Sequence, residues 1–364
     1  MKRIFRTFFR MACCFTALAL PAGFALGQTA EQNKKMEEST GRAFNAWLEE
    51  NGIKDGALVV MRAGEMIGRA YQGQRKSDMP VTVASLTKAI TGACIAQLID
   101  SGKLQLTDKM ADVLKVELEP LGKPQDPRFN LISIADLLRN RSGLKPAVDY
   151  TQGGLGQYLA AYSRTRKNLS KQMDQVARFE LAADPGSTYH YLNVNWLLLG
   201  AVVERITGEA YESYCYKAVV KPLGLPVSGL SPEWAMLSSY GGWQISAQDY
   251  AKFASQLAQS VIDRKGSVNE WLMQLSADAG GPGKSFYALG TSMRFTSKGR
   301  TIWHSGSWSA KSNGLDGFVE DSFGSYFASF DNGVTYVVNY SKAMRDKALA
   351  DLDSSMAKAI RESL

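Results

Sequence analysis

A serine and a lysine stand three residues apart at the start of an apolar segment. Ser85 and Lys88 are followed by the small and apolar run 89–96, AITGACIA. On a helix, this spacing places both side chains on one face, one turn apart, so that the amine can take the proton of the hydroxyl. Burial and the positive N-terminal end of a helix both disfavour a charged ammonium, which favours a base role for this lysine. The pattern predicts a nucleophilic serine.

The Ser-x-x-Lys pattern occurs twice more, and the context argues against both copies. Ser142 directly precedes a glycine that is predicted to end a helix, so it should not share a helical face with the lysine three residues later. Ser355 lies in a charged C-terminal stretch whose apolar residues recur at helical spacing, which is typical of a surface helix. We therefore expect Ser85 to be the nucleophile.

Tyr191 and Asn193 stand two residues apart at a loop end, just before the apolar run 196–203. Here a phenol can relay protons, while an amide can hold a substrate carbonyl or the lysine. The alternative, in which Asn193 caps a helix and Tyr191 packs in the core, stays open.

A third segment, Trp303-His304-Ser305-Gly306-Ser307, follows a β-pattern and precedes a loop. Glycine at this position lets a substrate backbone approach a strand edge. The next backbone N–H, that of Ser307, can face a developing oxyanion. Taken alone, His304 could equally be an ordinary histidine at a strand end.

The order Ser85-Leu86-Thr87-Lys88, Tyr191-Leu192-Asn193 and His304-Ser305-Gly306 resembles the three active-site elements of the serine β-lactamase and penicillin-binding DD-peptidase superfamily, specifically its class C-like branch. The resemblance implies an α+β fold, with an antiparallel sheet flanked by helices and a mostly helical lobe. It also implies hydrolysis through an acyl-serine without a cofactor. The implied catalytic residues are Ser85, Lys88 and Tyr191; those implied for substrate or oxyanion binding are Asn193, His304, Gly306 and Ser307.

Three departures from the family pattern narrow the expected function. Leu192 replaces the central serine of Tyr-Ser-Asn, Asn140 replaces a habitual histidine, and His304 replaces the lysine of Lys-Thr-Gly. His-x-Gly is typical of carboxypeptidase-, aminopeptidase- and some esterase-like members. We expect a serine hydrolase acting on an amide or ester bond, of carboxypeptidase, aminopeptidase, amidase or esterase type.

Three alternatives remain beside that expectation. One is a true class C-type β-lactamase, and another is a catalytically inactive penicillin-binding or sensor module on the same fold. A Ser-His-Asp hydrolase is disfavoured, since the chain has no Gly-x-Ser-x-Gly elbow and only two histidines.

Residues 1–27 read as a signal peptide: a basic start, an apolar stretch and small residues before a cut at Gln28. The mature chain 28–364 is then periplasmic or secreted and carries no stable membrane insertion. This segment holds four positive charges and no acid, so its removal lowers the formal charge from +7 to about +3. So small an excess gives no reason to expect nucleic-acid binding. The expected partner is a small-molecule or peptide-like acyl substrate, and the oligomeric state is left open.

Cys94 and Cys215 are the cysteines that remain after the signal peptide. One bridge between them is possible, but Cys94 on a buried helix is more simply a small core residue. With no HExxH, CxxC or EF-hand spacing, the sequence predicts no metal site.

Periodicity gives the expected elements. A β-hairpin is predicted at 57–62 and 66–71, and Asp331-Asn332-Gly333 predicts a second hairpin turn. The predicted helices are 85–101, 133–141 with Ser133 as N-cap, 155–163, 193–207, 246–260 and 342–363; the predicted strands are 287–295, 300–304, 325–330 and 334–339. Strands at both ends around a helical middle predict one domain, with a sheet lobe at about 28–80 and 265–364 and a helical lobe at about 81–264.

Overall fold

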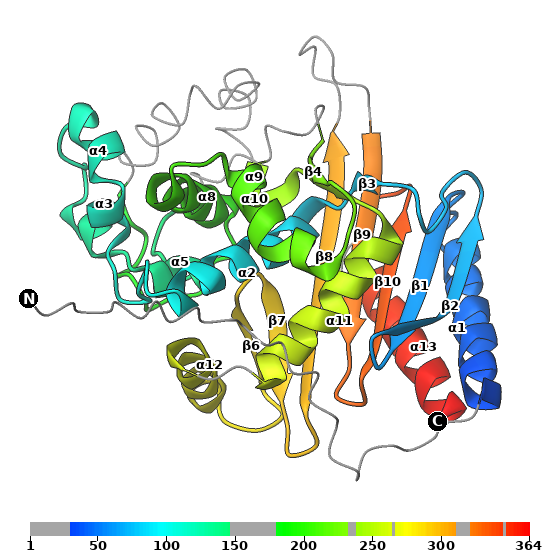
Figure 1. Cartoon of the computed structure of the whole chain (residues 1–364). Coiled ribbons are helices and arrows are strands. Elements are labelled where there is room, and N and C mark those ends of the chain that lie inside the picture. The colour runs from blue at the N-terminus through cyan, green and yellow to red at the C-terminus, as the bar shows by residue number, and fades with distance from the viewer. Residues whose placement is uncertain (1–29, 146–179, 232–237, 264–265, 311–320, 345–346) are drawn as a thin grey trace, which may run out of the picture.

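The structure is a computed structural model that describes residues 30–145, 180–231, 238–263, 266–310, 321–344 and 347–364. A seven-stranded sheet, in the order β2-β1-β10-β9-β8-β7-β6, runs through its centre, and every neighbouring pair is antiparallel (Figure 1). Its strands are β1 (Gly56–Arg62), β2 (Glu65–Gln72), β6 (Ser285–Ala288), β7 (Thr291–Phe295), β8 (Arg300–Ala310), β9 (Asp321–Ser329) and β10 (Val334–Tyr340). Because β1 pairs with β10, both ends of the chain build one sheet.

Helices α1 (Ala30–Glu50) and α13 (Lys347–Ser363) cover one face of the sheet (Figure 1). Successive strand residues point to opposite faces, and β1 shows this clearly. Leu58 and Val60 pack in the core under α1 and α13, whereas Val59 and Met61 pack in the larger core on the other face. β1 is thus buried on both sides, which accounts for its unbroken apolar sequence.

The central part of the chain forms helices that pack together in the larger core. The long ones are α2 (Thr87–Asp100), α8 (Asn193–Thr207), α11 (Ala247–Asp263) and α12 (Ser267–Asp278). The short ones are α3 (Met110–Val113), α4 (Lys115–Leu118), α5 (Ile134–Leu138), α9 (Tyr211–Cys215) and α10 (Ser238–Gly241). A small sheet in the order β3 (Val81–Thr82), β5 (Trp243–Ile245), β4 (Gly229–Leu230) lies beside them.

The predicted α+β architecture is confirmed, and several elements match closely. Helix α8 has the predicted bounds 193–207, and both predicted hairpins form. Ser133 caps α5 as expected, with a reciprocal capping box to Asp136. The predicted helix 155–163 lies outside the described residues.

Several boundaries differ from the prediction. Strand β8 continues to Ala310, so the third motif lies within a strand and not before a loop, and β9 begins at Asp321. The segment 287–295, expected as one strand, is the β6–β7 hairpin, because Leu289 and Gly290 turn with φ values of 50° and 79°. Helix α5 ends at Leu138, since Asn140 adopts φ 54°, outside the helical region. The closing helix α13 begins at Lys347, five residues later than expected.

Cys94 and Cys215 form a disulfide, so the simpler interpretation of Cys94 as a core thiol is wrong. Helix α9 packs against α2 and brings the two Cα atoms to 5.5 Å, within the range that a disulfide spans. The partners are 121 residues apart in the sequence, and no local pattern indicates that the two helices meet.

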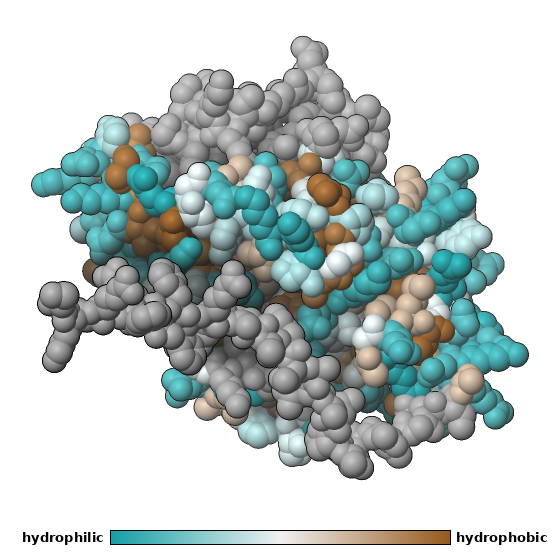
Figure 2. All heavy atoms as spheres, viewed as in Figure 1, coloured by the Kyte–Doolittle hydropathy of each residue, from teal (hydrophilic) through white to brown (hydrophobic). Residues whose placement is uncertain are grey.

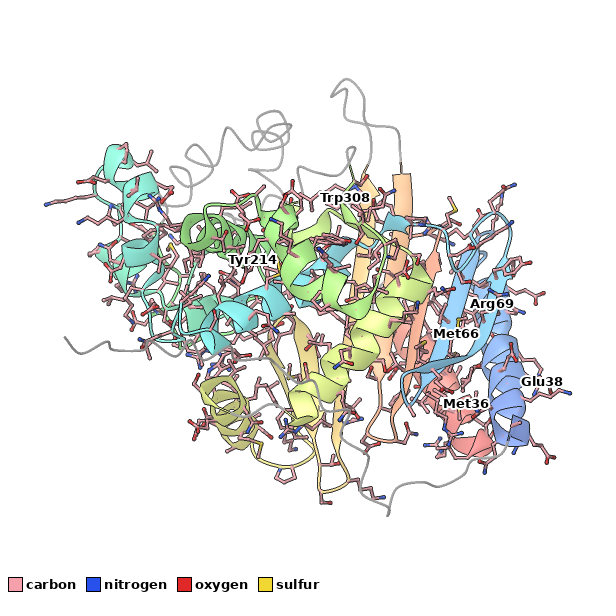
Figure 3. All side chains as sticks on the ribbon, viewed as in Figure 1. Met36, Glu38, Met66, Arg69, Tyr214 and Trp308 are labelled. Atoms are coloured by element: carbon pink, nitrogen blue, oxygen red, sulfur yellow. A yellow bond between two sulfur atoms is a disulfide. The ribbon has the colours of Figure 1, made fainter. Side chains whose placement is uncertain are left out.

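Helix α1 has a buried apolar face and an exposed polar face. On α1, Met36 is buried and Glu38 is exposed, and Figure 3 shows Glu38 pointing away from the molecule. Figure 2 shows a mainly hydrophilic face with small, separate apolar patches among the described residues. Within the described part of the chain, no helix is both long and apolar enough to span a bilayer.

Candidate active site

Ser85 lies in a single 3₁₀ turn, Ala84–Leu86, that leads directly into α2. Hydrogen bonds to two strands, β5 and β9, hold the residue just before this turn. Val83 donates its N–H to the Trp243 carbonyl (3.0 Å), and its own carbonyl accepts from Ser325 Oγ (2.6 Å). Ala84 has φ 47°, a left-handed conformation that a non-glycine residue adopts only where its surroundings impose it. The surroundings therefore fix the position of the serine.

Strand β8 packs directly against this turn, and Gly306 makes that possible. A Cβ atom at Gly306 would lie 2.5 Å from the Val83 carbonyl oxygen and 2.9 Å from the Ser85 nitrogen. No ordinary side chain fits there. The structure thus brings the first and third predicted motifs together, with Gly306 as the contact between them.

Lys88 is fully buried one turn after Ser85, and its amine contacts three oxygens. Nζ donates to Ser85 Oγ at 2.9 Å, to Asn193 Oδ1 at 2.7 Å and to the Tyr240 carbonyl at 2.8 Å. Three acceptors match the three N–H bonds of an ammonium. They also hold the amine against the serine hydroxyl, where the sequence predicts it.

Asn193 contacts the lysine, which decides between the two interpretations that the sequence left open for it. It is the first residue of α8, while the N-cap is Leu192, which makes no side-chain capping bond. The capping alternative for Asn193 is therefore wrong. The Tyr191 ring lies beside the same amine, with 5.0 Å between the ring centroid and Lys88 Nζ.

Tyr287, from β6, completes the site and was not predicted. Its hydroxyl lies 3.1 Å from His304 Nε2, and its ring meets the Tyr191 ring edge to face at 5.8 Å between centroids. Burial, reinforced by neighbouring Tyr191, raises the pKa of Tyr287 well above its ordinary value. The phenol therefore stays protonated and links the second and third motifs.

His304 is 6% exposed and electrically neutral. Burial and, second, the charge of Lys88 lower the pKa of the imidazole to about 3. A lysine at this position would bring a positive charge to the cleft, and His304 does not. This difference affects which substrates the site can hold.

A cavity of about 370 Å³ opens at the serine. The side chains around it are neutral: Ser85, Tyr189, Tyr191, Tyr287, Ser292, Trp303, His304, Ser305, Ser307, Met344 and Leu349. Strand β8 pairs with β7 only as far as Trp303 and continues to Ala310 along the cavity. Ser85 and Ser307 line the same cavity, which the predicted oxyanion role of their backbone N–H groups requires.

Asn140 holds the loop that leads to Tyr191. Its carbonyl accepts from the His190 N–H at 2.9 Å, and its Oδ1 accepts from Asn195 Nδ2 at 2.9 Å and from Trp196 Nε1 at 3.3 Å. The residue that departs from the family's histidine thus keeps a positioning role.

A buried Ser-Lys pair, a tyrosine just before α8, the first asparagine of that helix and a strand beside the serine are the arrangement of a serine hydrolase. The chain belongs to the Beta-lactamase family, whose family model matches residues 38–352. This confirms the family that the three motifs predicted.

Curated relatives carry several different names. A putative D-alanyl-D-alanine carboxypeptidase of Escherichia coli K12 is 27% identical over 208 residues, covering 54% of this chain and 45% of the relative. An N-acetylmuramyl-L-alanine amidase of Bacillus subtilis is 28% identical over 194 residues, covering 48% and 42%. The chain thus spans about half the length of these relatives.

Solved structures share the fold at low identity. A D-stereospecific amidohydrolase from Streptomyces superposes with a TM-score of 0.67 at 18% identity, covering 88% of this chain and 98% of that one. The hydrolase EstCE1, described as having promiscuous acyltransferase activity, gives 0.66 at 17% identity, covering 89% and 99%. A penicillin-binding protein homologue from Pyrococcus abyssi gives 0.66 at 16% identity, covering 87% and 76%. These similarities establish the fold. They do not identify the substrate, which has to be inferred from the site.

Proposed function

We propose that the protein is an exported hydrolase that cleaves amide or ester bonds whose immediate neighbourhood carries no carboxylate. One observation carries the proposal: the fully buried Lys88 amine lies 2.9 Å from Ser85 Oγ and is held there by Asn193. A pure binding module has no need to bury a lysine against a serine. The neutral cleft decides the substrate preference.

The reaction proceeds in two steps through an acyl-serine. The Lys88–Tyr191 pair holds one proton fewer than an ammonium and a phenol together. Ser85 Oγ attacks the carbonyl carbon as its proton passes to this pair, and the backbone N–H groups of Ser85 and Ser307 stabilise the oxyanion. The pair then protonates the leaving alcohol or amine. Water attacks the ester carbonyl in the second step by the same route, releasing the acid and restoring the Ser85 hydroxyl.

Neutral His304 favours esterase, amidase or aminopeptidase activity over carboxypeptidase activity. A carboxypeptidase substrate carries a carboxylate two bonds from the scissile nitrogen, which a cationic side chain would normally hold. Apart from Lys88, which is fully buried beside the serine, the structure describes no lysine or arginine at the Ser85 cavity. The His-x-Gly motif also separates this chain from the Lys-Thr-Gly β-lactamases within the class C-like branch.

Export is supported by two independent features. Residues 1–27 have the composition of a signal peptide, and Cys94 is bonded to Cys215, which fits a disulfide-permitting compartment. We place the mature chain in the periplasm or outside the cell.

The test is a substrate panel on mature 28–364: p-nitrophenyl butyrate, a D-amino acid anilide, a D-Ala-D-Ala peptide and nitrocefin. We expect the ester or the anilide to be turned over fastest, and we expect Ser85→Ala to abolish both turnover and labelling by a fluorophosphonate. Ser355→Ala is the matched control, because Ser355 also heads a Ser-x-x-Lys pattern but lies exposed on α13.

The other outcomes each identify an alternative. Fastest turnover of nitrocefin would make the protein a β-lactamase, and fastest turnover of the D-Ala-D-Ala peptide would make it a carboxypeptidase. Penicillin labelling of Ser85 without turnover of any substrate would identify a binding or sensor module. Undiminished fluorophosphonate labelling of Ser85→Ala would rule out Ser85 as the nucleophile.

A further inference from the structure

A second cavity adjoins the one at Ser85. It measures about 550 Å³ and lies among the end of α12, strand β6 and the loop at 186–189. Tyr189, Tyr287 and Ser292 line both cavities, so the two meet at these side chains. A group that reaches the second cavity therefore lies next to a substrate held at Ser85.

Unlike the neutral cavity at Ser85, the second cavity carries charge. Arg139 and Arg141 line it together with one acid, Asp278. The charge of Arg139 is compensated, because its Nη2 forms an ion pair with Asp136 Oδ1 at 2.8 Å. Arg141 forms no ion pair with any acid among the described residues; its Nη1 donates at 2.6 Å to a neutral acceptor, the Ser187 carbonyl.

We propose that Arg141 binds a carboxylate that the substrate carries several bonds away from the scissile carbonyl. A guanidinium is well suited to this task, since it is always charged and offers parallel N–H donors to a carboxylate. The idea rests on the proposed function, and it names the substrate class: an ester or amide that is neutral at the reacting bond and anionic at its far end.

Arg141 also has a structural role that any test must separate from binding. Its carbonyl accepts from the Gly186 N–H at 2.7 Å, and its side chain holds the Ser187 carbonyl. These bonds tie down the loop that leads to Tyr191. A purely structural Arg141 would affect every substrate equally, whereas a carboxylate-binding Arg141 affects anionic substrates selectively.

The experiment compares p-nitrophenyl monoesters of dicarboxylic acids of four to ten carbons with the same esters capped as methyl esters. In the wild-type protein, kcat/KM should favour the free carboxylate at one chain length. Arg141→Gln should remove this preference, an effect of about tenfold for a charge-assisted hydrogen bond. A second series, 4-carboxyphenyl butyrate against its methyl ester, places the carboxylate on the leaving group and shows which half of the substrate enters the cavity.

Two further variants give opposite controls. Asp278→Asn removes a negative charge from an exposed position in the cavity lining and should strengthen the carboxylate preference, even if Arg141→Gln fails to fold. Lys298→Gln removes one positive charge from the exposed β7–β8 turn and should leave the preference unchanged.

Binding to Ser85→Ala provides a readout that does not depend on turnover. Titration calorimetry should show tighter binding of the free carboxylate ester than of its capped form, and adding Arg141→Gln should abolish the difference. Equal loss for capped and uncapped esters, or no carboxylate preference in either series, would overturn the proposal. Absence of turnover of every ester would instead defeat the proposed function, while the calorimetry would still test Arg141.

Discussion

The backbone nitrogen of Ser85 and the α-carbon of Gly306 lie so close that a Cβ atom on the glycine would stand 2.9 Å from that nitrogen. The strand carrying the third motif therefore rests directly on the nucleophile turn. Their contact sets the separation between Ser85 and Ser307, the proposed oxyanion donor. The glycine of the third motif is therefore a requirement of packing.

Gly306→Ala should lower kcat/KM by about 100-fold, the cost of a displacement near 1 Å in an active site. The added methyl group must push β8 away from Ser85 and Val83, because both contacts are with backbone atoms. Initial rates on p-nitrophenyl butyrate, with circular dichroism to verify folding, measure the effect. Ser309→Ala, at an exposed position of the same strand, is the control. Activity of folded Gly306→Ala within twofold of wild type would contradict this account.

Tyr287→Phe should slow turnover by about tenfold while the protein stays folded. The change leaves the aromatic packing against Tyr191 and removes only the hydroxyl, which bonds His304 Nε2 and also bonds Asn140 and Tyr191. A buried imidazole nitrogen without its partner costs about 1–3 kcal/mol and lets the ring reorient. The effect should fall on kcat more than on KM, and the urea midpoint should drop modestly. An unchanged kcat would show that Tyr287 only fills space.

The sequence predicts the chemistry-bearing motifs better than the residues that hold them. Ser85, Lys88, Tyr191, Asn193 and His304 stand in short patterns whose spacing reflects local geometry, and the structure brings them together. The same holds for α8, because its apolar run and its loop boundary are local signals.

Residues whose role depends on contacts with residues far away in the sequence cannot be predicted from local patterns. Tyr287 reaches His304 only because β6 and β7 form a hairpin, and that hairpin depends on Gly290 fitting against the Lys88 carbonyl. Arg141 shares its cavity with residues of α12 and β6, which lie far from it in the sequence. Within the stretch 287–295, the sequence marks the turn only by Gly290, in an otherwise continuous β-pattern.

The free energy of unfolding should decrease as the pH is lowered through the ordinary titration range of histidine, because His304 is buried in its neutral form. Its pKa is about 3 when folded and near 6.5 when unfolded, so the unfolded chain binds the extra proton between these values. The stabilisation is present above about pH 6.5 and is lost as the pH falls towards 3. The loss should reach about 2 kcal/mol at pH 5.

Urea unfolding at pH 7 and pH 5 measures this dependence. His304→Gln, which stays neutral at both values, should show a flatter profile than wild type. His190→Gln replaces the chain's other histidine, half-buried in the loop, and is the matched control. Parallel profiles for wild type and His304→Gln would contradict a neutral, buried His304.

Replacing Cys94 and Cys215 together by alanine should lower the free energy of unfolding by up to about 5 kcal/mol, because the bond closes a long loop. The cross-link restricts mainly the unfolded chain, so the reduced protein keeps its folded site. Turnover at 25 °C should then remain near the wild-type rate, even though α2 carries Lys88 and directly follows the turn that holds Ser85. Urea titrations with and without dithiothreitol test this: reductant should lower the wild-type midpoint to that of the double variant and leave the variant unchanged. Two free thiols in the denatured, unreduced mature protein would contradict the bond.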